Sequence, residues 1–161
     1  MTIKISRSTE TPTQDQILSL EEVLGVKLPS EYIEFLAQNN GGKPETNTFK
    51  ISENNDSGIN GFIPLDKIVY ETKLIRDQIG GELMPVAYAE GGNYLCIAVA
   101  GKWIGSIFFM DHEIPGGDAI TKLAPSLTQF LEDAQPVDPK QVQLKPGQVK
   151  KAWINPDFLK K

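Results

Sequence analysis

The sequence of 161 residues has one cysteine and one histidine, and both shortages limit the chemistry it can support. A single thiol, Cys96, cannot form an internal disulfide, and its place in the apolar run 94–100 favours a small buried hydrophobe. With one histidine and no HExxH or CxxC spacing, a zinc site built by this chain is not expected. We therefore predict no metal site and no cofactor.

Long hydrophobic runs are also missing. No stretch approaches the roughly 18 apolar residues of a membrane span, and the polar opening MTIKISRSTETPTQ has no apolar segment of the secretory type. The content of 40% apolar and 23% charged residues is that of an ordinary globular domain. We expect a cytoplasmic protein that has no membrane partner.

Basic residues are fewer than acidic ones, and their distribution is uneven. Residues 1–135 carry 10 Lys and Arg against 19 Asp and Glu, a net charge of −9, whereas residues 136–161 carry six against two, a net charge of +4. A body of charge −9 is poorly suited to phosphate backbones, so nucleic acid is not an expected partner. Opposite charge accelerates association, which favours a basic protein partner. The alternative is an acidic surface that only maintains solubility.

Apolar periodicity and capping signals predict a pair of helices near the N-terminus. Thr13 and Gln16 have the spacing of a capping box, and Gly25 suits a left-handed stop. Ser30 is a favourable N-cap for the second helix, and Asn40-Gly41-Gly42 is expected to end it as a left-handed cap.

Two further helices and five strands complete the predicted fold. One helix begins at Asp66 and ends before Gly80-Gly81, and the other begins after Ser126, which forms a capping box with Gln129. The predicted strands are 49–51, 59–65, 84–88, 94–100 and 103–110, with the loop SENNDSG between the first two. The last three form a central meander, joined by AEGGN and by Gly101-Lys102. The fold class is therefore α+β, a mainly antiparallel sheet flanked by about four helices.

The amino-acid composition of the chain changes after the last predicted helix. Residues 1–135 read as one α+β domain, and residues 136–161 as a separate basic tail with four prolines and six lysines. The tail also contains Trp153, Ile154, Phe158 and Leu159, which is too apolar a set for a purely solvated segment. We expect it to dock on the chain's own sheet or on a partner chain.

Catalytic residues are not evident. His112 lies between Asp111 and Glu113 at the end of a predicted strand, where neighbouring side chains point to opposite sides. Gly91-Gly92 leads into a strand rather than a helix, so it does not fit a phosphate-binding loop. We predict no catalytic residue and no enzymatic activity; a small hydrolase using His112 is the minor alternative.

Two segments carry a resemblance to a known family. LPSEYIEFLAQNNGG and MPVAYAEGGNYLCIAVAGKWIGSIFFMDHE resemble motifs of the SUKH superfamily, which includes the yeast Smi/Knr cell-wall assembly regulators. The first motif is the more distinctive, and the resemblance covers roughly residues 13–135. It implies an α+β domain without known catalytic activity and does not extend to the basic tail.

The resemblance also implies a function and a set of positions. Bacterial members are mostly regarded as immunity proteins that neutralise a toxin, often a nuclease, and fungal members as regulators of wall synthesis. The leading hypothesis is a toxin–antitoxin immunity protein that binds a basic toxin domain; the alternative is a scaffold in cell-wall signalling. The oligomeric state is left open. Partner contacts are expected at Asn40, Gly41, Gly42, Glu90, Gly91, Gly92, Asn93, Asp111, His112 and Glu113.

Overall fold

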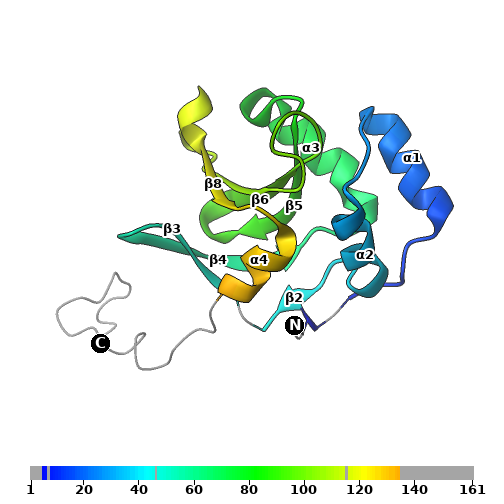
Figure 1. Cartoon of the computed structure of the whole chain (residues 1–161), viewed down its shortest axis with the longest axis horizontal. Coiled ribbons are helices and arrows are strands. Elements are labelled where there is room, and N and C mark those ends of the chain that lie inside the picture. The colour runs from blue at the N-terminus through cyan, green and yellow to red at the C-terminus, as the bar shows by residue number, and fades with distance from the viewer. Residues whose placement is uncertain (1–4, 7, 46, 115, 135–161) are drawn as a thin grey trace.

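The α+β architecture expected from the sequence is confirmed by the computed structural model, which describes residues 5–6, 8–45, 47–114 and 116–134 (Figure 1). Within these ranges the chain forms four α-helices and eight strands. The tail 136–161, with its expected docking, lies outside the described residues.

Six strands form one antiparallel sheet in which sequence neighbours are also spatial neighbours. They are β3 (Thr48–Ser52), β4 (Asn55–Phe62), β5 (Leu83–Ala89), β6 (Asn93–Ala98), β7 (Ile107–Met110) and β8 (Ile120–Ala124). A separate two-stranded sheet joins β1 (Ile5–Ser6) to β2 (Lys43–Pro44). The predicted meander corresponds to β5, β6 and β7.

The four helices are α1 (Gln14–Leu24), α2 (Ser30–Gln38), α3 (Leu65–Ile79) and α4 (Leu127–Asp133). Helix α3 packs on β5 with α1 beside it, while α4 packs on β8 and contacts α2 (Figure 1). As predicted, Thr13 closes a capping box at α1, and Gly25 ends that helix with a left-handed φ of 69°.

The central strand β6 is buried on both faces, as its sequence predicts. Adjacent residues of a strand point to opposite faces, and Tyr94 and Leu95 do so here. The Tyr94 hydroxyl bonds to Glu71 of α3, whereas Leu95 pairs in register with Phe109, which lies in the aromatic cluster near α4. Helices α3 and α4 therefore cover opposite faces of the sheet.

The sheet curls strongly around the aromatic cluster. The ring of Phe49 on β3 lies 6.0 Å from that of Phe109 on β7 and 5.4 Å from that of Phe130 on α4. In a flat sheet β3 and β7 are four strand spacings apart, or about 19 Å. Curling brings the outer strands β3 and β8 into contact and encloses the cluster between them.

Several local predictions are wrong. Ser30 is the first residue of α2 rather than its N-cap, a position that Pro29 takes without a side-chain bond. Helix α2 ends at Gln38 with Asn39 as C-cap, so Asn40-Gly41-Gly42 does not terminate it. In both cases proline or tertiary contacts decide the boundary rather than local capping preference.

Two connections of the sheet also differ from the prediction. The expected loop SENNDSG shrinks to the turn Glu53-Asn54, because residues from Asn55 onward pair with β3. Strand β7 starts only at Ile107, so Trp103 lies in the turn before it. Trp103 is 45% exposed, with the Lys122 ammonium 3.7 Å from its ring centroid, and the predicted start of the strand at this residue is wrong.

Glu31 connects two helices that are far apart in sequence. Its carboxylate accepts hydrogen bonds from the Leu127 backbone N–H at 2.9 Å and from the Thr128 hydroxyl at 2.6 Å. Ser126 caps the same helix by accepting from the Gln129 N–H, while the Gln129 side chain donates to Asp133 and leaves the predicted capping box open. The start of α4 is thus held on α2.

We predict that Glu31→Ala lowers the free energy of unfolding by about 1–2 kcal/mol, because it removes a charged cap from the first turn of α4. Urea unfolding measures the loss. Glu34→Ala is the matched control, since this glutamate also lies on α2 but is exposed. Equal stabilities of the two variants would contradict the role assigned to Glu31.

Candidate partner-binding surface

Asn40 is a structural junction between three segments. Its side-chain oxygen accepts from the backbone N–H of Leu65, the first residue of α3, at 2.7 Å, and its amide donates to the Glu10 carbonyl at 2.9 Å. Its own carbonyl accepts from the backbone N–H of Thr9 at 2.8 Å. The first N–H groups of a helix have no partner within it, so Asn40 supplies one for α3 while fixing the N-terminal segment.

Gly42 lies where two chain segments approach each other closely. Its φ is 91°, and an added Cβ would lie 2.7 Å from the Ser6 carbonyl oxygen and 2.8 Å from the Ile5 side chain. Its carbonyl accepts from the Phe62 N–H at 2.7 Å. Gly41, with φ of 83°, faces Pro64. The Asn-Gly-Gly motif therefore joins α2, β4 and the N-terminal strand.

The second motif consists of a one-turn 3₁₀ helix, Glu90–Gly92, and of Asn93, the first residue of β6, and it packs against His112. Asn93 Oδ1 accepts from the His112 backbone N–H at 2.9 Å and lies 2.7 Å from its ring Nδ1. Since the backbone group must donate, the facing Asn93 atom is oxygen and ring Nδ1 carries a proton. An added Cβ at Gly92 would lie 3.2 Å from the His112 ring. Glycine is needed there for this contact and for its φ of 84°.

Asp111 and Glu90 contact nearby parts of the backbone. The Asp111 carboxylate accepts from the Glu113 N–H at 3.0 Å, closing the turn after β7. The Glu90 carboxylate folds over β4, where an added Cβ at Gly58 would lie 2.8 Å from Oε2. Glu90 and His112 nevertheless remain exposed.

The structure brings residues 90–93 and 111–113 together and separates both from Asn40-Gly41-Gly42. Gln78, near the end of α3, donates to the His112 carbonyl at 3.0 Å, whereas Asn40 binds Leu65 at the start of the same helix. Gln78 is 13 positions after Leu65, which corresponds to roughly 20 Å of helix. The ten predicted contact residues therefore form two clusters at opposite ends of α3.

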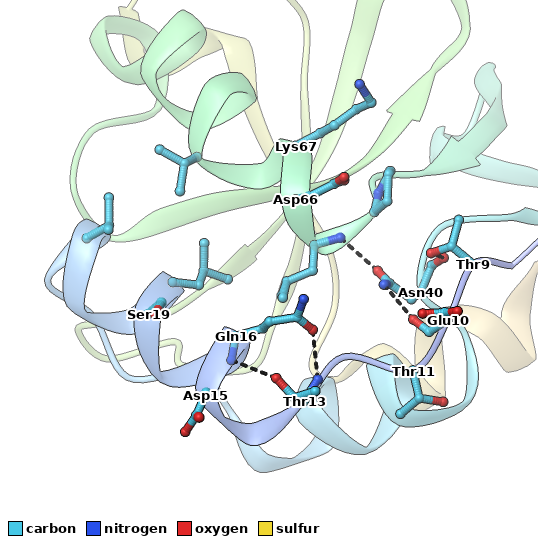
Figure 2. A pocket seen from close by; sticks show the side chains of 15 residues that line it. Thr9, Glu10, Thr11, Thr13, Asp15, Gln16, Ser19, Asn40, Asp66 and Lys67 are labelled. Atoms are coloured by element: carbon cyan, nitrogen blue, oxygen red, sulfur yellow. Dashed lines mark hydrogen bonds between the residues drawn. The ribbon is translucent and has the colours of Figure 1, made fainter.

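A groove of about 810 Å³ lies beside the Asn40 junction, between the N-terminal segment, α1 and the start of α3 (Figure 2). Its apolar lining includes Leu20, Val23 and Val69, and Val23 is 59% exposed. Figure 2 shows the bonded pair Thr13 and Gln16 on the α1 side and Asn40 across from it. Its charged lining residues are Glu10, Asp15, Asp66 and Lys67. The groove is thus apolar within and acidic in net charge.

A comparison with known families identifies the family of this domain. The family model of the SMI1/KNR4 family (SUKH-1) matches residues 11–133. The chain belongs to this family. A comparison with curated proteins found no match. The matched region contains both motif clusters and most of the groove, so they are all parts of one SUKH-1 domain.

The SUKH-1 domain also contains a buried polar cluster that the sequence analysis missed. Glu71 of α3 is 8% exposed, and its two carboxylate oxygens each accept a tyrosine hydroxyl, from Tyr88 and Tyr94, at 2.7 Å. The sequence feature that could have indicated this cluster is a carboxylate on the apolar stripe of α3, three residues after Ile68 and four before Ile75. Its partners, on two strands, could not be read from that pattern.

The ionisation of the two tyrosines fits their role as donors. Burial, followed by the bond to the Glu71 carboxylate, raises the pKa of Tyr88 to about 12, and the same causes raise the pKa of Tyr94. A neighbouring negative charge disfavours the phenolate. Both hydroxyls therefore keep their protons at neutral pH and link α3 to β5 and β6.

The part of the chain that the structure describes contains no cluster of three or more His, Cys, Asp or Glu suited to a metal ion. None of the helices in these ranges is long and apolar enough to cross a membrane. Cys96 is fully buried, and burial raises the pKa of its thiol, so the thiolate needed for nucleophilic attack is disfavoured.

Proposed function

We propose that this SUKH-1 domain is a non-enzymatic immunity protein that neutralises a basic toxin domain by binding it in the groove between α1 and α3. Family membership supports a protein-binding role. The observation that carries the proposal is the groove itself, with apolar side chains inside and three carboxylates among its lining residues.

The charge of this part of the chain favours a basic partner. Residues 8–45, which form the N-terminal segment, α1, α2 and β2, contain seven acidic residues, of which Glu21 is buried, and two lysines. Such a surface raises the association rate of a basic protein at low ionic strength. Burial of apolar groove residues then supplies affinity that does not depend on salt.

A hydrolase centred on His112 is less well supported. In the described residues the ring bonds only to the Asn93 side-chain oxygen, and neither a hydroxyl nor a thiol group lies within hydrogen-bond distance of it. A histidine base activates a nucleophile that it contacts directly. We therefore assign His112 to closing the turn at Asn93.

The proposal predicts that Asp15→Lys combined with Asp66→Lys weakens the complex with the cognate basic toxin at least tenfold and abolishes protection in co-expression. Two reversed charges replace attraction by repulsion at the groove. Calorimetry at low and high salt measures the affinity, and growth measures protection. The partner is to be sought among the products of the genes that flank the gene for this chain.

Glu53→Lys with Asp56→Lys is the matched control, because these exposed carboxylates lie at the β3–β4 hairpin, away from α1 (Figure 1). It should bind and protect like the unmodified chain. Full protection by the groove variant would disprove the assigned surface, and absence of any complex at low salt would disprove the function.

A further inference from the structure

We propose that the basic end of the chain, residues 145–161 (KPGQVKKAWINPDFLKK), docks into the same groove of its own molecule and covers it when no partner is bound. The docking is a second property of the groove proposed to bind the toxin. It adds an internal competitor, so that the partner must displace the tail.

The chemistry of the segment matches that of the groove. Residues 145–161 carry five lysines and one aspartate, and Trp153 and Ile154 follow Lys150 and Lys151 with only Ala152 between them. Lysines can approach Glu10, Asp15 and Asp66 while the indole is buried against Val23 and Val69. A solvated groove of about 810 Å³ has room for several such side chains.

The path from the end of the described chain to the groove is short. The described residues end at Ala134, which follows α4, and the seven residues of this helix span about 10 Å. Glu31 holds the start of α4 on the first turn of α2, and at the other end of α2 the Ala37 carbonyl accepts from the Thr11 hydroxyl, at the groove. Nine residues of α2 span about 14 Å.

The intervening chain is long enough for this path. Residues 135–152 separate Ala134 from Trp153, and 18 extended residues reach roughly 60 Å. A tether of 18 residues gives a local concentration on the order of millimolar. A dissociation constant near 1 mM therefore suffices for the tail to occupy the groove about half of the time.

Occupation of the groove by the tail has a consequence for partner binding. The apparent affinity for a competing basic protein falls in proportion to the fraction of molecules whose groove is open. Weak cationic ligands are then excluded, while a cognate toxin with more contacts displaces the tail. The separation of charge into −9 and +4 within one chain fits this arrangement.

The test uses the full chain with Trp103→Phe, which leaves Trp153 as its single tryptophan. We expect Trp153 to show blue-shifted emission and acrylamide quenching at least twofold slower than in the free peptide 145–161. Adding Asp15→Lys and Asp66→Lys should restore peptide-like emission and quenching. Adding Glu53→Lys and Asp56→Lys instead should leave Trp153 protected.

Milder variants and dilution complete the test. Asp15→Asn with Asp66→Asn, which keeps side-chain size, should give partial exposure of Trp153, and circular dichroism verifies that each variant is folded. Peptide-like quenching in the parent chain overturns the proposal. Protection that survives groove reversal, or that disappears on dilution, also overturns it, because the tail then docks elsewhere or on a second copy. Toxin binding is measured separately, so either proposal can fail alone.

Discussion

Glu71→Ala is expected to lower the free energy of unfolding by about 3 kcal/mol. The substitution leaves the Tyr94 hydroxyl buried without its acceptor and removes the acceptor of Tyr88. A buried polar group that loses its partner costs roughly 1–3 kcal/mol. It also creates a small cavity beneath α3, which adds to the loss.

Chemical denaturation measures this effect, and related variants separate its causes. Glu71→Gln retains one acceptor oxygen at nearly the same size, so its loss should be smaller than that of alanine. Glu22→Ala, on the exposed side of α1, is the control and should change stability by less than about 0.5 kcal/mol. If Glu71→Ala behaved like Glu22→Ala, the tyrosine bonds would contribute nothing measurable.

Gly42→Ala is expected to cost about 3 kcal/mol. A left-handed φ costs an L-residue roughly 1–2 kcal/mol, and the added Cβ also collides with the Ser6 carbonyl oxygen. The backbone must move to relieve this contact, and overpacking of this kind costs typically 1–3 kcal/mol. We expect β1 to separate from β2 in this variant.

Gly25→Ala is a matched control, because Gly25 has a similar positive φ of 69° and open space around its Cβ position. It should lose only the conformational contribution, about 1 kcal/mol. The difference between the two alanine variants measures the close approach at Gly42. Denaturation gives both values, and hydrogen exchange at Ser6 reports whether β1 detaches. Equal losses would show that the contact with Ser6 costs nothing.

The elements predicted correctly are those whose signal is local. The capping box at Thr13 and the left-handed stop at Gly25 each lie within one or two helical turns, and the apolar stripe of α3 lies within that one helix. Continuous apolar character on both faces likewise identified β6 as a central strand. Such features depend on backbone geometry and residue spacing, which a single sequence contains.

The errors occur where distant segments decide local structure. Strand β8 was missed because ITKLA has little alternation and gains its partners only from β7. Asn40-Gly41-Gly42 looked like a helix stop, yet it serves α3, β4 and the N-terminal strand. Local propensities do not predict hydrogen bonds to residues that are 20 or more positions away in the sequence.

The sequence alone determined the α+β class, the acidic body, the lack of an obvious catalytic set and the motifs of the SUKH-1 family. Tertiary structure decided how these parts meet. It placed the motif residues in two clusters at opposite ends of α3, and it opened the acidic groove beside one of them. The physical reason is that charge and periodicity are properties of the chain, whereas a groove exists only between packed elements.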